Sequence, residues 1–263
     1  MDVRAKKHLG QHFLTSDQIA HDIAHTLQGS GYTKVLEIGP GKGILTEELI
    51  RIHGDNLTVV DIDKESIVYL KKYFPKLGDR IIEGDFLEMR LTDITEDKIA
   101  LIGNYPYNIS TQIMFKVLDN KEQIVECSGM FQKEVAVRIA SAPGNKQYGV
   151  TSVLLQCWYD IEYLFSVGPE HFDPPPKVNS GVIRLTRNNR KELDIPEKFF
   201  KRVVKTSFGM RRKTLRNSLK GMLNEYNVSL SENYAKERPE QLNVEQFLEI
   251  ARMLYAAKLE KEG

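Results

Sequence analysis

Short apolar runs alternate with amphipathic stretches through the first half of the chain, and this alternation limits the folds open to it. The apolar runs have the length of buried strands, and the stretches between them carry apolar residues at spacings of three and four. The expected strands are 34–38, 57–60, 80–83, 99–102 and 124–131. Strands that alternate with helices over short connections form a parallel sheet covered on both faces. We therefore expect an α/β fold.

The pattern changes in the second half of the chain. Two further expected strands, 161–167 and 178–185, bracket the run Pro174-Pro175-Pro176. Helical patterns cover 132–141 and 149–157, and from about residue 188 the pattern is helical throughout, over 196–208, 212–224 and 243–258. The sequence therefore predicts an α/β domain over 1–187 and a smaller all-α domain over 188–263.

Composition excludes several classes of protein. With 41% hydrophobic residues, the chain has no apolar run near the roughly 20 residues of a membrane span. The first residues lack the apolar segment of a signal peptide, and Cys127 and Cys157 are isolated. His21 and His25 lie four residues apart, but no carboxylate is spaced to share a metal with them. We expect a cytoplasmic protein without a membrane segment or a metal site.

The net charge of +1 conceals a strongly basic segment. Between Arg187 and Lys220 there are twelve lysine or arginine residues against three acidic ones, so the rest of the chain is acidic. Such an asymmetry favours a local contact with a polyanion, although a solvated cationic helix is the alternative. In the expected helix 212–224, Arg212, Arg216 and Lys220 would share one face. The candidate residues for such a polyanion contact are Lys205, Arg211, Arg212, Lys213, Arg216 and Lys220.

The strand 99–102 leads into a turn whose residues could bind and orient a substrate. Gly103 is followed by Asn104-Tyr105-Pro106-Tyr107, at the strand end that faces the ligand crevice in an open α/β sheet. Pro106 stiffens the turn and fixes a carbonyl, Asn104 adds an acceptor, and Tyr107 adds an aromatic face. Two acceptors beside a ring suit a planar exocyclic amine such as N6 of adenine. An ordinary Asn-X-Pro turn is the alternative.

This arrangement would supply what an aryl amine needs in order to react. The lone pair of such an amine is delocalised into the ring, which makes the nitrogen a poor nucleophile. If both N–H bonds point at carbonyl oxygens, the lone pair turns toward an electrophile. Positioning and electrostatics then lower much of the barrier, and no strong base is required.

Three strand ends suggest a nucleoside-type cofactor. Glycines 39, 41 and 43 follow the first strand, and the dinucleotide fingerprint would place its third glycine one residue later. Asp61 ends the next strand and can accept from ribose hydroxyls, while Asp85 beside Phe86 can accept from an adenine amine. Together these residues predict an S-adenosylmethionine pocket. Solvated caps at the strand ends are the alternative for the two aspartates.

These motifs resemble those of the rRNA adenine N6-dimethyltransferase family, specifically its bacterial small-subunit members, over nearly the whole chain. Further matching segments are 10–14, 172–180 and 211–217. The resemblance implies a Rossmann-like class I methyltransferase domain, and it implies that Tyr107 and Phe172 sandwich the target adenine. The candidate catalytic residues are then Asn104, Pro106, Tyr107 and Phe172. The candidate cofactor-binding residues are Gln11, His12, Leu14, Gly39, Gly41, Asp61, Asp85, Phe86 and Asn104.

The resemblance also implies an activity. Methyl groups would pass from S-adenosylmethionine to N6 of two adjacent adenosines near the 3′ end of small-subunit (16S) rRNA. The partner would be a pre-ribosomal 30S particle, and the enzyme a monomer that acts in small-subunit biogenesis. Alternatives are a resistance-type methylase of large-subunit rRNA, an assembly factor that acts mainly by binding, and a protein-glutamine methylase. Tyr105 and Asp61 depart from the family pattern, which usually has Leu or Ile and Glu there.

Overall fold

The computed structural model describes residues 3–262, and its contacts divide the chain into two compact units. The first unit runs to Val137 and includes Asp160–Arg187; the second comprises Arg138–Tyr159 and the chain from Asn188 onward. The second part of the second unit therefore begins at Asn188, and the division into domains 1–187 and 188–263 stays a prediction. The segment Arg138–Tyr159, however, groups with the C-terminal helices. That the two units have separate functions stays a prediction.

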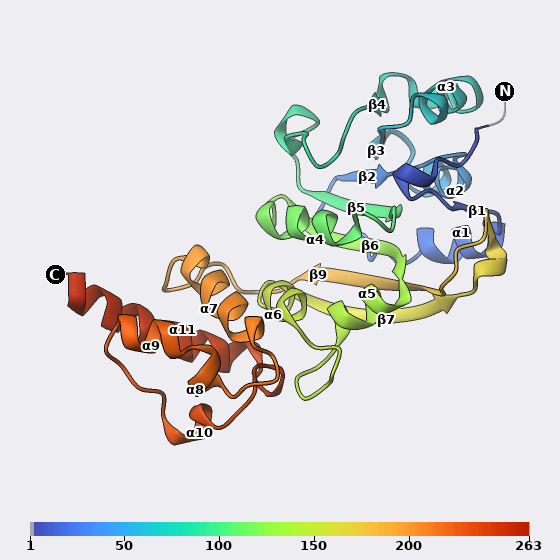
Figure 1. The fold of residues 1–263 in the computed structure, drawn as a ribbon. Helices are drawn as coiled ribbons and strands as arrows, with labels where there is room; N and C mark the ends of the chain where they lie inside the picture. Colours follow the sequence, from blue (N-terminus) through green and yellow to red (C-terminus); the bar gives the residue numbers. More distant parts are fainter. Residues whose placement is uncertain (1–2, 263) are drawn as a thin grey trace. The chain divides into compact units, whose positions relative to one another are not determined.

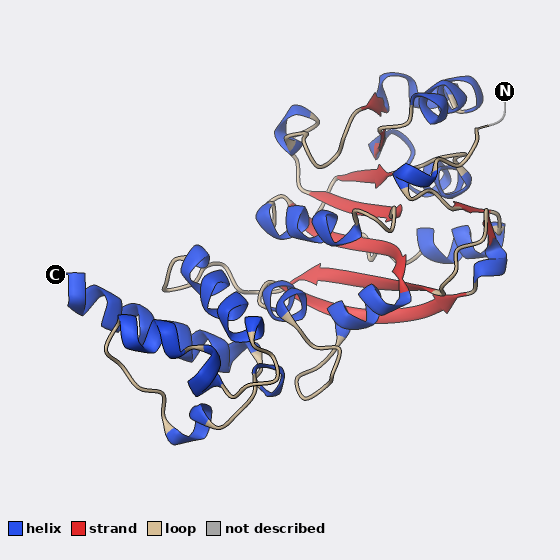
Figure 2. Ribbon diagram, viewed as in Figure 1, coloured by secondary structure: helices blue, strands red, loops and turns tan. Residues whose placement is uncertain are grey.

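The first unit is built on a seven-stranded sheet with the strand order β4-β3-β2-β5-β6-β9-β7 (Figure 2). The strands are β2 (Lys34–Ile38), β3 (Leu57–Asp61), β4 (Ile81–Glu83), β5 (Ile99–Asn104), β6 (Ile124–Gln132), β7 (Tyr159–Val167) and β9 (Ser180–Arg187). Strands β2 to β6 pair in parallel as expected. Strand β9 pairs antiparallel to β6. Between the sheet neighbours β7 and β9 the chain forms only a short 3-10 turn and the two-residue strand β8, without the helix that usually joins parallel strands.

Helices cover both faces of this sheet (Figure 1). On one face, α1 (Asp17–Ala24), α2 (Ile44–His53) and α3 (Lys64–Tyr73) bury their apolar sides against alternate strand residues such as Val35. Residues between these in sequence, such as Leu36, point to the opposite face and are also buried. Helix α4 (Ser110–Asp119) contacts β6. The sheet is therefore an inner layer, which explains its continuous apolar runs.

A second, two-stranded sheet was not expected from the sequence. Strand β1 (Phe13–Leu14) pairs antiparallel with β8 (Phe172–Asp173), so Leu14 lies opposite Phe172. This pairing holds the N-terminal segment against the Pro-rich connection between β7 and β9. Short 3-10 turns occupy Lys7–Leu9, Gly54–Asn56, Pro75–Arg80, Leu91–Asp93, Pro169–His171 and Pro239–Gln241.

The second unit is helical. Helix α5 (Lys133–Ala140) leads into it, and its own helices are α6 (Val150–Gln156), α7 (Glu197–Gly209), α8 (Leu215–Ser218), α9 (Lys220–Glu225), α10 (Glu232–Ala235) and α11 (Val244–Glu262). Among residues 3–262, no helix combines the length and the apolar character that crossing a membrane requires.

The expected helix 212–224 is wrong in its extent. Helicity begins only at Leu215, because Thr214 is extended and the Leu215 amide donates to the Glu237 carbonyl at 2.7 Å. A break at Leu219 then separates α8 from α9. Arg212 therefore lies in a turn, and the three expected basic residues do not share one continuous helical face. The expected apolar side is nevertheless present, since Leu215, Leu219, Met222 and Leu223 are buried.

Candidate active site

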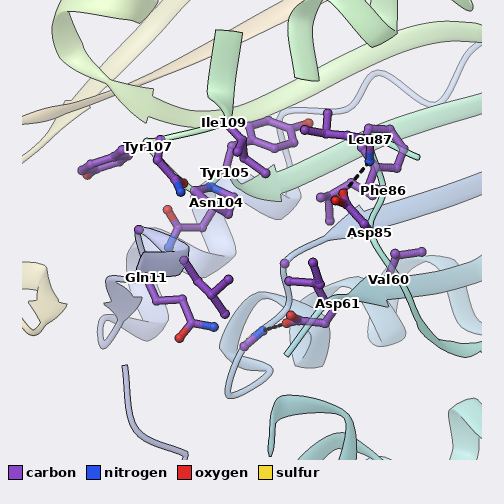
Figure 3. Close-up of a pocket in the computed structure, with 18 of the residues that line it drawn as sticks. Gln11, Val60, Asp61, Asp85, Phe86, Leu87, Asn104, Tyr105, Tyr107 and Ile109 are labelled. Atoms are coloured by element: carbon purple, nitrogen blue, oxygen red, sulfur yellow. Dashed lines mark hydrogen bonds between the residues drawn. The ribbon is translucent and has the colours of Figure 1, made fainter. Parts of the chain in front are cut away.

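A cavity, partly open to solvent, lies at the carboxyl ends of β2, β3 and β5 (Figure 3). Its lining comes entirely from the first unit: residues 9–13, the three strand ends, 84–87 and 104–109. This edge of a parallel sheet is where α/β proteins bind ligands.

The turn between β2 and α2 brings bare backbone to the cavity. Gly41 and Gly43 have φ values of 55° and 79°, which side-chain-bearing residues rarely adopt. A Cβ at Gly41 would lie 2.8 Å from the Phe13 ring, and one at Gly43 would lie 2.4 Å from the Phe74 ring. Only glycine therefore fits at either position, and this explains the spacing found in the sequence.

Asp61 at the end of β3 is buried and anchored. Its Oδ1 accepts from the Asp63 amide at 2.9 Å, and its Oδ2 accepts from the Gly41 amide at 3.2 Å. Burial raises the pKa of Asp61 to about 6, although these backbone hydrogen bonds oppose the rise. Each carboxylate oxygen can accept a further hydrogen bond, so the pair of ribose hydroxyls expected here finds acceptors.

Glu37, which the sequence did not single out, lies beneath this site within β2. It is completely buried, and burial raises its pKa to about 8. Its Oε2 accepts a hydrogen bond from the Thr46 hydroxyl at 2.7 Å, which ties β2 to α2. At neutral pH Glu37 is therefore mostly protonated.

The third strand end supplies Asp85 and Phe86. Asp85 Oδ1 accepts from the Leu87 amide at 2.9 Å, which leaves Oδ2 for an external donor (Figure 3). Phe86 is almost fully buried and forms part of the cavity wall. Lys116 on α4 supports this loop: its Nζ lies 5.0 Å from the Phe86 ring centroid and donates to the carbonyls of Leu87, at 2.9 Å, and Met89. Nothing in the sequence had marked Lys116.

Asn104 is held at one end of its amide. Its Nδ2 donates to the backbone carbonyl of His12 at 2.9 Å, so Oδ1 is the atom left to accept from a ligand. The Pro106 carbonyl accepts from the Ile109 amide at 3.2 Å and keeps a second lone pair. The two expected acceptors therefore stand two residues apart in a turn that lines the cavity.

Tyr107 presents a half-buried ring at the same turn. Its carbonyl accepts from the Ser110 hydroxyl at 3.1 Å, and its phenol oxygen lies 2.5 Å from the Ser180 hydroxyl oxygen. The His12 ring lies beside it, with 5.4 Å between ring centroids. Burial raises the pKa of Tyr107, so the phenol is neutral at physiological pH.

The unusual Tyr105 packs into the sheet. Its hydroxyl donates to the Ser128 carbonyl at 2.9 Å, and only 1% of the residue is exposed. A Cβ at Gly129 would lie 2.7 Å from the Tyr105 ring, so this glycine provides the space for the ring. The departure from the expected Leu or Ile is therefore accommodated without a new polar group in the cavity.

The N-terminal segment closes one side of the cavity. Gln11 Nε2 donates to Asp63 Oδ2 at 3.0 Å, and its Oε1 accepts from the Lys6 amide at 2.8 Å. The Lys6 ammonium pairs with Asp63, which the sequence alone did not indicate. At the other end, Asn108 Nδ2 donates to the His8 carbonyl at 3.2 Å. Side chains from β3–α3 and from the 104–109 turn thus hold this segment in place.

The comparisons with known proteins agree with this site. The family model of ribosomal RNA adenine dimethylases matches residues 3–256. The chain belongs to this family. A relative from Cytophaga hutchinsonii, named ribosomal RNA small subunit methyltransferase A, is 60% identical over 96% of this chain and 98% of its own. A relative of the same name from Porphyromonas gingivalis is 57% identical over 97% of this chain and 99% of its own.

Two solved structures show the same fold as this adenine dimethylase. A dimethyladenosine transferase from Plasmodium falciparum has a TM-score of 0.77 at 21% identity, covering 94% of this chain and 98% of its own. The 23S rRNA methyltransferase ErmE has a TM-score of 0.68 at 24% identity, covering 91% and 99%. The fold is thus the Rossmann-like class I methyltransferase fold, and the protein is an S-adenosylmethionine-dependent rRNA adenine dimethyltransferase.

The cavity of the dimethylase fits this cofactor. Anchored carboxylates stand at the ends of the neighbouring strands β3 and β4, and the glycine turn after β2, the next strand of the sheet, exposes backbone. The structure brings most of the expected residues to this cavity, and the roles assigned to them stay predictions. Those that line it are Gln11, His12, Gly39, Gly41, Asp61, Asp85, Phe86, Asn104, Pro106 and Tyr107.

Two expected residues lie elsewhere in the dimethylase. Leu14 and Phe172 are cross-strand partners in the β1–β8 sheet, and both are buried in the hydrophobic core of the first unit. Neither residue lines the cavity. The Pro-rich sequence did not indicate the burial of Phe172, and the sandwich of the target adenine between Tyr107 and Phe172 stays a prediction.

The six candidate RNA-binding residues of the dimethylase all lie in the second unit, and none lines the cavity. Arg211 donates to the Lys146 carbonyl at 2.5 Å, and Arg216 pairs with Glu232 at 2.8 Å. Arg212, Lys213 and Lys220 are exposed, as is Lys205. Arg211 and Arg216 thus have partners inside the second unit.

Proposed function

We propose that this dimethylase methylates N6 of two adjacent adenosines near the 3′ end of 16S rRNA, giving N6,N6-dimethyladenosine. The observation that supports it best is the state of Asn104. Its amide nitrogen is occupied by the His12 carbonyl, and its oxygen remains in a cavity shared with Asp61 and Asp85. Such an acceptor matches an exocyclic amine rather than a hydroxyl or a thiol, because an amine presents two N–H bonds to two acceptors.

The side chains around the cavity would divide the task. S-adenosylmethionine, when bound, supplies an electrophilic methyl group. Asn104 Oδ1 and the Pro106 carbonyl would accept the two N–H bonds of the target amine and direct its lone pair toward that group. The proton leaves once the new N–C bond has made the nitrogen acidic, so water can take it and no basic side chain is needed.

Tyr107 would hold the target base. An adenine within an ordered RNA must leave its stack to reach the cavity, and an aromatic platform there recovers part of that cost. Base–aromatic stacking contributes about 1–3 kcal/mol. Tyr107 would form one side of this platform, with the His12 ring beside it.

The substrate would be a pre-ribosomal 30S particle in the cytoplasm, bound by a monomeric enzyme that acts in small-subunit biogenesis. The exposed basic residues of the second unit would contact rRNA phosphates. The names of the 57–60% identical relatives support the small subunit as target. The fold does not separate this from methylation of 23S rRNA, because ErmE has the same fold at 24% identity. A role in assembly by binding alone would leave the anchored Asn104, Asp61 and Asp85 without a task.

The experiment is labelled methyl transfer to purified 30S subunits that lack the modification, with 50S subunits as the control. Nucleoside analysis of the product should give N6,N6-dimethyladenosine, mapped to two adjacent positions near the 3′ end. Label in 23S rRNA would instead favour the resistance-type activity. Stable binding to 30S particles without any transfer would favour the assembly role.

A further inference from the structure

We propose that Ser180 is a positioning residue for methyl transfer, which fixes the ring of Tyr107 through their two hydroxyl groups. This rests on the proposed role of Tyr107 as the platform for the target adenine. Ser180 does not line the cavity, so it would act only through Tyr107.

The contact between the two hydroxyl groups joins the Tyr107 side chain, which could otherwise rotate, to a serine that the sheet holds in place. The Tyr107 phenol oxygen lies 2.5 Å from Ser180 Oγ. Ser180 is completely buried, at the start of β9, where it pairs with Gln132 of β6. One residue earlier, the Asn179 carbonyl accepts from the Lys133 amide at 2.9 Å. Strand pairing therefore fixes the anchor, and it cannot follow a swinging ring.

The second end of Tyr107 is also fixed. The hydroxyl of Ser110, at the start of α4, donates to the Tyr107 carbonyl at 3.1 Å, and Ser110 is itself buried. A tyrosine ring rotates about only two bonds, so anchoring the main chain at one end and the phenol at the other leaves it a single orientation. Burial raises the pKa of Tyr107, which keeps the phenol protonated and the hydroxyl pair intact at neutral pH.

The orientation of this ring matters because the base would follow it. An adenine stacked on Tyr107 moves with the ring, and its amine must meet Asn104 Oδ1 and the methyl donor together. A displacement of about 1 Å can cost 10²-fold in rate. Releasing the phenol should therefore lower kcat while the stacking area, and with it the affinity for RNA, stays nearly the same.

The test is a double-mutant cycle of Ser180→Ala and Tyr107→Phe, assayed by methyl transfer to unmodified 30S subunits. Each single variant should lower kcat by about tenfold, less than the roughly 10²-fold expected for a full 1 Å shift. KM for the subunit should stay within about twofold, and the double variant should be no slower than either single one, because each change removes the same hydrogen bond.

The matched control is Ser128→Ala. Ser128 is a completely buried serine on β6 whose hydroxyl lies 2.6 Å from Thr26 Oγ1 and donates to the Ile183 carbonyl at 3.0 Å, away from Tyr107. It should keep wild-type kcat even if its melting temperature falls. An unchanged kcat in Ser180→Ala, rate reductions that multiply in the double variant, or an equal reduction in Ser128→Ala would overturn the inference. Transfer by the wild-type protein in the same assay tests the proposed function separately.

Discussion

At the scale of single residues, the site depends on polar side chains in which one atom is hydrogen-bonded within the protein and a second atom can still accept from a ligand. Asn104 gives its amide nitrogen to the His12 carbonyl and keeps its oxygen. Asp85 gives one oxygen to the Leu87 amide and keeps the other. Such anchoring sets the direction of the free atom before a ligand arrives, so less reorganisation is needed during the reaction.

Removing the free oxygen of Asn104 should therefore slow methyl transfer while binding to the 30S subunit persists. We expect Asn104→Ala to lower kcat by about 10²–10³, the range for losing one preorganised electrostatic partner. Binding to 30S subunits should persist. Calorimetry with S-adenosylhomocysteine must accompany the assay, because Asn104 also borders the cofactor side of the cavity. Transfer within a few-fold of wild type would contradict the role of this residue.

Asp61 predicts a pH dependence of cofactor binding. Burial raises the pKa of Asp61 to about 6, so part of the population is protonated in mild acid. Ribose hydroxyls donate to the ionised form, so the affinity for S-adenosylhomocysteine should fall as the pH drops through 6 and level off above about 7. The contribution of Asp61 to the free energy of unfolding has the opposite pH dependence. It is greatest below the pKa of about 3.9 that an aspartate has in the unfolded chain, and it is lost as the pH rises through 6.

Calorimetry between about pH 5 and pH 8 measures this dependence, with Asp61→Asn as the comparison. The amide keeps one acceptor but cannot ionise, so its weaker affinity should vary little with pH. If both proteins show the same slope, another group near the cofactor must titrate and Asp61 is only a strand-end cap.

At the scale of elements, the turn between β2 and α2 depends on its glycines. Gly43→Ala would force a Cβ to within 2.4 Å of the Phe74 ring at a φ of 79°. We expect a loss of about 2 kcal/mol or more in the free energy of unfolding, since strain and overpacking add. Gly221→Ala is the control, because it meets open space within α9 and should be neutral or stabilise by up to about 1 kcal/mol. Calorimetric melting distinguishes the two, and equal melting temperatures would refute the steric account.

Much of the first unit could be predicted because its information is local. Buried strands appear as short apolar runs, and their expected limits agree with the structure within about two residues for β4, β6, β7 and β9. The polar residues after β3 and β5 marked the edge where the cavity lies. Parallel topology turns a local pattern into a shared site, which is why Asp61 and Asn104 were found without the structure.

The features of the fold and of the site that could not be predicted depend on contacts between segments far apart in the sequence, and such contacts leave no local pattern. Phe172 pairs with Leu14, a residue 158 positions away, and no local pattern indicates this contact. The Leu215 amide donates to the Glu237 carbonyl, so the helix begins at Leu215, whereas periodicity had placed its start at Arg212. The Ser180 anchor of Tyr107 likewise joins residues 73 positions apart.

At the scale of the whole molecule, chemistry and charge occupy different units. The cavity lies within the first unit, whereas the basic candidates Lys205 to Lys220 lie in the second. Changes to these basic residues should therefore act on rRNA and leave the cofactor site intact. Within the second unit, charge alone does not identify the residues that bind RNA, because some cations already have partners.

Three exposed cations of the second unit allow its role in rRNA binding to be tested. Arg212, Lys213 and Lys220 are exposed and, within residues 3–262, no ion pair engages them. Replacing all three with Ala should weaken 30S binding and flatten its dependence on salt by about 0.7–0.9 for each phosphate that is no longer neutralised. Affinity for S-adenosylhomocysteine should not change. Filter binding across a range of salt concentrations measures the slope.

Arg216→Ala is the matched control for these three changes. Arg216 is also exposed, but it pairs with Glu232 at 2.8 Å, so its removal frees a carboxylate and changes the slope less than removal of an uncommitted cation. An exposed ion pair contributes only about 0–1 kcal/mol, so the variant should still fold. If the triple variant binds 30S subunits with the wild-type slope, the residues that neutralise phosphates must lie elsewhere. The second unit would then serve as a structural appendage, and the first unit would have to hold the rRNA by itself.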